Sequence, residues 1–181
     1  MMQHLMEVFE ENSSELYSLA FLLTGDADGG VEAFNRALEL EETENGAFGQ
    51  FMHSWARKLI IVEALETIRK DLQTSKERVA RTPEDETTGG AKWKRRAYIS
   101  REEFEEAVIA IDPFPRCAML LTIFEGMSVQ AASALLNADK KLTRKAQRIG
   151  IVELTRHLTG DSGRDPYREP GRNPVPALSL S

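Results

Sequence analysis

The fold of this chain is decided by residues 126–150, GMSVQAASALLNADKKLTRKAQRIG. Ser128 is expected to cap a first helix, because its hydroxyl accepts from backbone N–H groups that the first turn leaves unpaired. Asn137 ends that helix, since asparagine tolerates the left-handed conformation common at helix C-termini. Asp139 is then the cap of a second helix that begins at Lys140. The stretch predicts two helices joined by a short turn.

The second of these helices has two different faces. One face is apolar and carries Leu142, Ala146 and Ile149. Another carries cations at the spacing i, i+3, i+4 and i+7, preceded by Lys140: Lys141, Arg144, Lys145 and Arg148. This is the layout of the recognition helix of a helix-turn-helix, which packs one face on its partner and offers Lys and Arg to DNA phosphates. An ordinary solvated basic face is the alternative reading of the row by itself.

A further helix is predicted directly upstream, with Asp112 as its cap and Pro113 in its first turn. The run from there, IDPFPRCAMLLTIFEGMSVQAASALLNADKKLTRKAQ, resembles the promoter-binding C-terminal domain of extracytoplasmic-function sigma factors of the sigma-70 family. The residues that carry the resemblance follow in order: Ile111, Pro113, Arg116, Glu125, Gly126, Ser128, Leu135 and Leu136. The resemblance implies that Lys140, Lys141, Arg144, Lys145 and Arg148 bind promoter DNA. A change of apolar phase after Gly150 indicates a bend or a repacking there.

The front of the chain predicts three antiparallel helices around an apolar core, over about 3–24, 31–42 and 48–72. In the third, an apolar stripe runs through Trp55, Leu59, Val62, Leu65 and Ile68, which places Trp55 in the core. The sequences LYSLAFLLTGDADGGVEAFNRAL and WARKLIIVEALETIRK resemble the polymerase-binding and promoter-melting domain of the same sigma factors.

That second resemblance implies a polymerase-binding helix with Glu32, Asn35 and Arg36 at the contact positions. Only Glu32 keeps the acidic character typical of the family, and Arg36 reverses it. At the position where the family has an asparagine that meets the opened promoter strand, this chain has Val62. A solvent-facing helix is the alternative reading for Glu32 and its neighbours.

The predicted organisation is all-α, with two small helical domains on a flexible linker. Residues 1–72 form a sigma region 2-like domain, and 100–159 form a sigma region 4-like helix-turn-helix domain that opens with a capping box of Ser100 and Glu103. The linker, 73–99, is rich in Gly and charge and contains a basic cluster at 92–96, and the tail, 160–181, has the composition of a disordered segment.

Charge and composition limit the classes of function. The net charge is −6, yet Arg36 is the only Lys or Arg in residues 1–54, so the back half offers a local field that suits phosphates. One cysteine and no long apolar run favour a cytoplasmic protein without a membrane segment. No metal-ligand spacing, phosphate-binding Gly loop or nucleophile–base pattern is present, so we expect no enzyme, metal or cofactor.

Two hypotheses follow. The first is a sigma-factor-like transcription protein that binds core RNA polymerase through its front domain and promoter DNA through its helix-turn-helix. The second is a degenerate sigma-like protein that no longer initiates transcription and acts as an interaction module for an anti-sigma factor or another regulator. A plain helix-turn-helix repressor would also need a dimerisation surface, and none is evident in the sequence.

Overall fold

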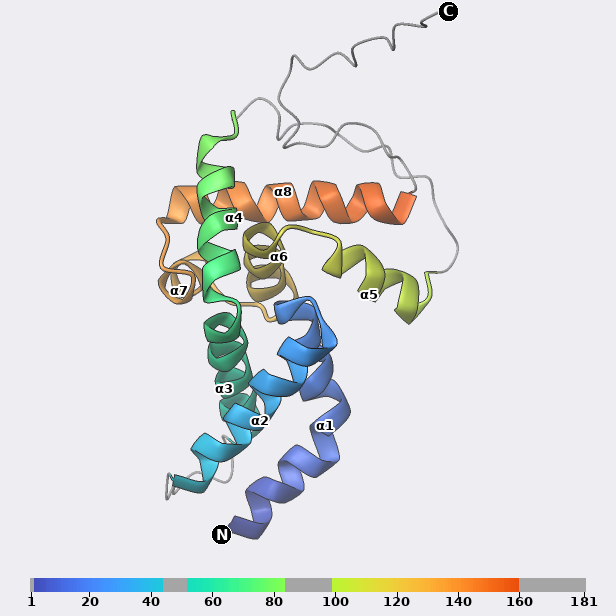
Figure 1. The fold of residues 1–181 in the computed structure, drawn as a ribbon, viewed down its shortest axis with the longest axis vertical. Helices are drawn as coiled ribbons and strands as arrows, with labels where there is room; N and C mark the ends of the chain where they lie inside the picture. Colours follow the sequence, from blue (N-terminus) through green and yellow to red (C-terminus); the bar gives the residue numbers. More distant parts are fainter. Residues whose placement is uncertain (1, 44–51, 84–98, 160–181) are drawn as a thin grey trace, which may run out of the picture.

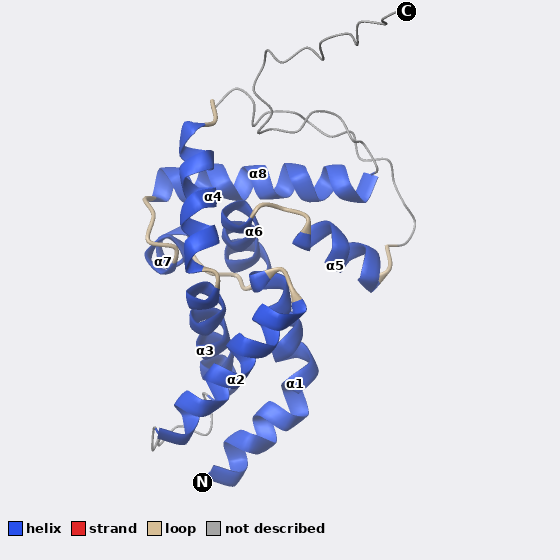
Figure 2. Ribbon diagram, in the orientation of Figure 1, coloured by secondary structure: helices blue, strands red, loops and turns tan. Residues whose placement is uncertain are grey.

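In a computed structural model of the protein, residues 2–43, 52–83 and 99–159 are described, and within these ranges the regular structure is entirely helical (Figures 1 and 2). The predicted all-α class is confirmed. The helices of the front half are α1 (Met2–Thr24), α2 (Ala27–Thr43), α3 (Met52–Thr67) and α4 (Arg69–Arg81). Those of the back half are α5 (Arg101–Ile109), α6 (Pro113–Met119), the π-helical turn η3 (Leu120–Phe124), α7 (Val129–Leu135) and α8 (Lys140–Thr159).

The first two helices meet at a sharp turn, which is stabilised by short-range polar contacts. Gly25 has a φ of 92°, a conformation that glycine adopts without the steric cost of a Cβ. Asp26 then accepts a hydrogen bond from the backbone N–H of Gly29 at 2.7 Å through its carboxylate. This contact explains why α2 begins at Ala27, ahead of the predicted start at 31: the aspartate satisfies a first-turn donor.

The buried face of α3 differs from the predicted stripe. Val62 is 46% exposed, and Trp55 is only partly buried and is absent from the buried core, so the prediction of a core tryptophan is wrong. Leu65 and Ile68 are buried as predicted, the latter at the junction with α4, and the other residues that α3 buries lie on a face rotated from the predicted one: Ala56, Ile60, Ile61 and Ala64. Small alanines on this face allow α1 and α2 to approach closely.

Residues 73–81 correct the predicted linker, because they belong to α4 rather than to an irregular segment. The helical conformation is interrupted between α3 and α4 at Ile68, where φ is −100° and ψ is 17°. Leu72, Ser75 and Val79 are buried at helical spacing against the back half of the protein. The buried stripe contains only two apolar side chains and a serine, which is why the hydrophobic pattern alone did not indicate a helix here.

The back half confirms one local capping prediction and contradicts another. Ser100 and Glu103 form the capping box of α5. Asp112, by contrast, makes no side-chain cap at the start of α6, and the prediction that it does so is wrong. The hydroxyl of Ser75 takes that role from another helix, accepting the backbone N–H of Phe114 at 2.9 Å.

Of the bend or repacking predicted after Gly150, no bend is seen: α8 runs through Gly150 as one straight helix (Figure 1). A Cβ at position 150 would lie 2.6 Å from the carbonyl oxygen of Pro115 and 3.0 Å from Cβ of Met119. Glycine therefore permits the close crossing of α6 and α8, at which the apolar face of Ala146 and Ile149 is buried as predicted.

Both halves of the chain share one cluster of buried side chains, which runs from Leu16 in α1 and Ile60 in α3 to Phe114 in α6 and Ile149 in α8. Helix α6 lies at its centre, with α8 and α4 packed against it and α1 also in contact (Figure 1). The two predicted units are thus packed on each other in this structure, through residues that the separate patterns assigned to separate cores.

Candidate nucleic-acid interface

Helices α7 and α8 are joined by a short turn and are stabilised by caps and by a small polar contact between the two helices. Ser128 accepts from the N–H of Ala131 at 3.1 Å, and Asp139 accepts from the N–H of Leu142 at 2.8 Å, as predicted. Asn137 has a φ of 47°, which confirms the left-handed residue expected at the end of α7. Inside the motif, the hydroxyls of Ser133 and Thr143 are 2.9 Å apart and buried, which fixes how α7 meets α8.

Four of the five predicted DNA-binding cations are exposed along the first turns of α8. Lys140, Lys141, Arg144 and Arg148 all lie on the solvent side. The ammonium of Lys140 donates to the side-chain oxygen of Gln130 on α7 at 3.1 Å. The exposed cations lie opposite the buried face of Ala146 and Ile149, so α8 has the division into a packed face and a basic face that the sequence predicts.

Lys145 is the exception among the cations, since it is only 7% exposed. Its ammonium donates to the backbone carbonyl of Thr82, at the C-terminal end of α4. The sequence placed it in the exposed row because residues at i, i+3 and i+4 share a helix face. Lys145, however, lies at the side of this row nearest to α4, and the C-terminal end of α4 covers it.

Helix α4 is attached to the back half of the chain by further polar contacts. The carboxylate of Asp112 accepts from Ser75 at 2.5 Å and from two nitrogens of Arg78, one at 3.2 Å and one at 2.5 Å. The ammonium of Lys76 donates to the backbone carbonyl of Asn137 at 3.0 Å, in the turn of the motif. These contacts between residues far apart in sequence could not be inferred from either motif alone.

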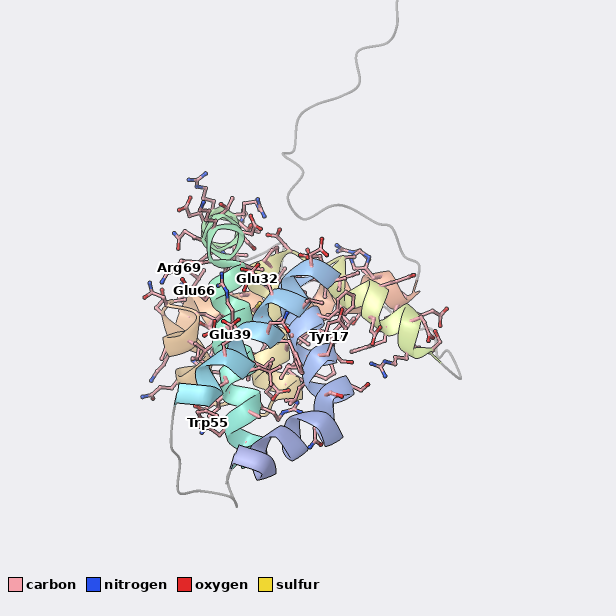
Figure 3. The ribbon with its side chains drawn as sticks, turned by 60° about the horizontal axis from the view of Figure 1, so that its bottom comes forward. Tyr17, Glu32, Glu39, Trp55, Glu66 and Arg69 are labelled. Atoms are coloured by element: carbon pink, nitrogen blue, oxygen red, sulfur yellow. The ribbon has the colours of Figure 1, made fainter. Side chains whose placement is uncertain are left out.

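The predicted polymerase-binding residues lie together on one exposed face of α2. Arg36 and Glu32 form an ion pair at 2.6 Å one helical turn apart, and Asn35 is exposed beside them. Figure 3 looks onto this side of the molecule and labels Glu32, Glu39 and Glu66. Because Arg36 neutralises the nearest carboxylate, the acidic character of α2 at this point is reduced.

Arg116, one of the residues that carry the resemblance, joins the two halves. Its guanidinium is 3% exposed and donates to the carbonyls of Leu23 and Thr24, at the end of α1, at 3.2 and 2.8 Å. It also donates to the carbonyls of Ile109 and Ile111 at 3.1 and 3.0 Å. Burial lowers the pKa of Arg116, because desolvation penalises its charge. No pattern in the sequence indicated that this side chain donates to the ends of two helices at once.

A partly buried ion pair supports the turn before α7. Arg57 on α3 pairs with Glu125 through two nitrogens, at 3.0 and 2.5 Å, and also contacts Glu15 on α1. The hydrogen bond to Glu125 raises the pKa of Arg57. The Glu-Gly turn that is part of the resemblance is therefore held to the front half.

Other predicted features lie outside these contacts. The basic cluster at 92–96 and the tail, 160–181, fall outside the described residues. Over the ranges that are described, no three His, Cys, Asp or Glu side chains are grouped so that they could bind a metal ion. Cys117 is buried, and burial raises its pKa from 9.0 to about 11.

None of the helices in the described ranges combines the length and the apolar character needed to cross a bilayer. Comparison of the chain with models of protein families, with curated proteins and with solved structures gives no match.

Proposed function

We propose that this protein is a divergent sigma-factor-like transcription protein whose helix-turn-helix binds promoter DNA and whose front helices contact core RNA polymerase. The single observation that supports it is the exposed row of Lys141, Arg144 and Arg148 on the second of two consecutive helices that both begin with a side-chain cap. A recognition helix needs this division, because its buried face sets its orientation while its cations meet phosphates.

DNA binding is tested by fluorescence anisotropy with a labelled duplex of mixed sequence over a range of salt concentrations. We expect the triple variant Lys141→Ala/Arg144→Ala/Arg148→Ala to bind more weakly, and its log–log salt slope to fall by about 3, since each phosphate contact contributes about 0.9. The matched control removes three exposed cations elsewhere: Arg69→Ala/Lys70→Ala/Arg81→Ala. If both triple variants lose the same affinity and slope, binding does not use α8 and the proposal fails.

Transcription requires a second experiment. The purified protein should co-elute with core RNA polymerase, and together they should give a run-off transcript from a promoter selected by the protein. We expect Glu32→Lys to reduce co-elution, with Glu106→Lys on the exposed side of α5 as a control of equal charge change. Absence of co-elution would remove the initiation role while leaving DNA binding in place.

A degenerate, non-initiating interaction module is the second candidate function. The observation that favours it is the pairing of Arg36 with Glu32, which weakens the acidic face expected for polymerase binding. Such a module would bind a regulator such as an anti-sigma factor through its front surface. It predicts no transcript in the run-off assay and retention of a regulator by the full chain.

A further inference from the structure

Helix α4 lies across the first turns of α8, the part of a recognition helix that contacts bases. Two contacts bracket this part of the motif: Lys76 reaches the carbonyl of Asn137 before α8 begins, and Lys145 reaches the carbonyl of Thr82 within it. Figure 1 shows α4 crossing α8 near the end from which α8 begins. The start of the candidate DNA-binding helix is therefore already partly occupied.

On the flank of α8 where the end of α4 covers Lys145, we expect too little room for a duplex. An α-helix with its side chains is about 10–12 Å across, and the major groove is about 12 Å wide. A second helix packed at about 8–10 Å from the first cannot enter the same groove with it. Lys145 lies one helical turn from Lys141 and from Arg148, so the end of α4 that covers Lys145 stands beside the exposed cations.

Many of the contacts that hold α4 in place are polar and partly exposed, whereas Ser75 is buried and bonds to Asp112 and to the backbone N–H of Phe114. Arg78 is 44% exposed where it pairs with Asp112, and the contact of Lys76 with Asn137 is exposed. The apolar side chains that α4 buries are Leu72 and Val79. Segments with little apolar burial and exposed polar contacts separate from the rest of a protein at lower cost than its core helices.

We propose that α4 is an autoinhibitory latch, and that α8 enters the major groove only after α4 has moved away from Asp112, Asn137 and Lys145. This inference rests on the proposed DNA-binding function and adds its regulation. In the arrangement seen in the structure, which we call closed, Lys145 is bound to the end of α4 and this side of α8 is covered. Opening exposes Lys145 and clears the approach, so only the open population binds DNA.

The test locks and releases the latch in the full chain. Lys76→Cys and Ala138→Cys are joined by a short, reducible bis-methanethiosulfonate crosslinker, chosen because the lysine reaches the backbone next to Ala138. Cys117 is fully buried and does not compete for the reagent. Anisotropy with the mixed-sequence duplex is measured on the crosslinked protein and again after dithiothreitol. We expect affinity to rise about tenfold on reduction, as the open fraction recovers.

A second variant loosens the latch without a crosslink. Lys76→Ala/Arg78→Ala removes two cations, which by charge alone weakens DNA binding, so tighter binding would report opening. We expect about tenfold tighter binding, a salt slope increased by about 1 as Lys145 joins the contacts, and faster hydrogen exchange in α4. The matched control, Lys70→Ala/Arg81→Ala, removes two exposed cations of the same helix without touching these contacts, and it should bind no more tightly than the wild type.

The outcomes separate the two proposals. If reduction of the crosslink and loosening of α4 both leave affinity unchanged, while the Lys141/Arg144/Arg148 variant still loses it, the latch is refuted and DNA binding stands. If neither the wild type nor the loosened variant binds the duplex at low salt, the DNA-binding function fails and the latch fails with it.

Discussion

Arg116 allows the sharpest test of how the two halves are held together. Its guanidinium donates to four backbone carbonyls, two at the end of α1 and two at and beyond the end of α5. These carbonyls belong to helix ends, where no intrahelical donor is available to them. Replacing Arg116 with Met keeps an unbranched side chain in the core but leaves all four acceptors without the guanidinium.

The expected loss of stability is the difference between the lost hydrogen bonds and the relief of desolvation. Four lost hydrogen bonds at about 1 kcal/mol net each give about 4 kcal/mol. Methionine carries no charge, so the variant avoids the desolvation that lowers the pKa of Arg116, and this offsets part of the loss. We therefore expect Arg116→Met to lower the free energy of unfolding by about 3 kcal/mol. Arg116→Lys should lie between, at about 1.5 kcal/mol, because one ammonium cannot reach both pairs of carbonyls.

The assay is urea unfolding followed by far-ultraviolet circular dichroism and by tryptophan fluorescence. Arg81→Met is the matched control, since that side chain is 82% exposed, and its effect should stay within about 0.5 kcal/mol. Because the halves share one buried cluster, both probes should report a single transition. A loss below about 1 kcal/mol for Arg116→Met would refute the role of Arg116, and two separate transitions would refute the shared core.

Two further predictions concern the interior. Gly150→Ala should destabilise the protein by about 1–3 kcal/mol in the same urea assay, because the new Cβ would meet the carbonyl of Pro115 at 2.6 Å, and unchanged stability would contradict the close crossing of α6 and α8. Burial raises the pKa of Cys117 to about 11 in the folded protein, against an ordinary value of 9.0 when the thiol is exposed. Between pH 9.0 and about 11 the unfolded state therefore binds fewer protons, and the free energy of unfolding falls as the pH rises. The slope should reach about 1.4 kcal/mol per pH unit relative to Cys117→Ala, and equal slopes for the two proteins would exclude a buried, neutral thiol.

Local features of the back half were determined by the sequence itself. Ser128, Asn137 and Asp139 act within a few residues of their own positions, because caps and left-handed ends depend on nearby backbone groups. The capping box of α5 and the apolar face of α8 follow from short-range spacing in the same way. For these elements, residue type and spacing were sufficient.

Only the tertiary structure decided which face of each helix is buried and which cations are available. Val62 lies in an apolar run yet is exposed, because α1 and α2 pack on another face of α3. Lys145 lies in a basic row yet is covered, because the end of α4 packs over it. Asp112 was expected to cap its own helix, but its carboxylate receives Ser75 and Arg78 from α4 instead. Such contacts join residues more than thirty positions apart, so periodicity along the chain does not predict them. The position of α4 over the candidate DNA-binding helix is therefore known only from the tertiary structure.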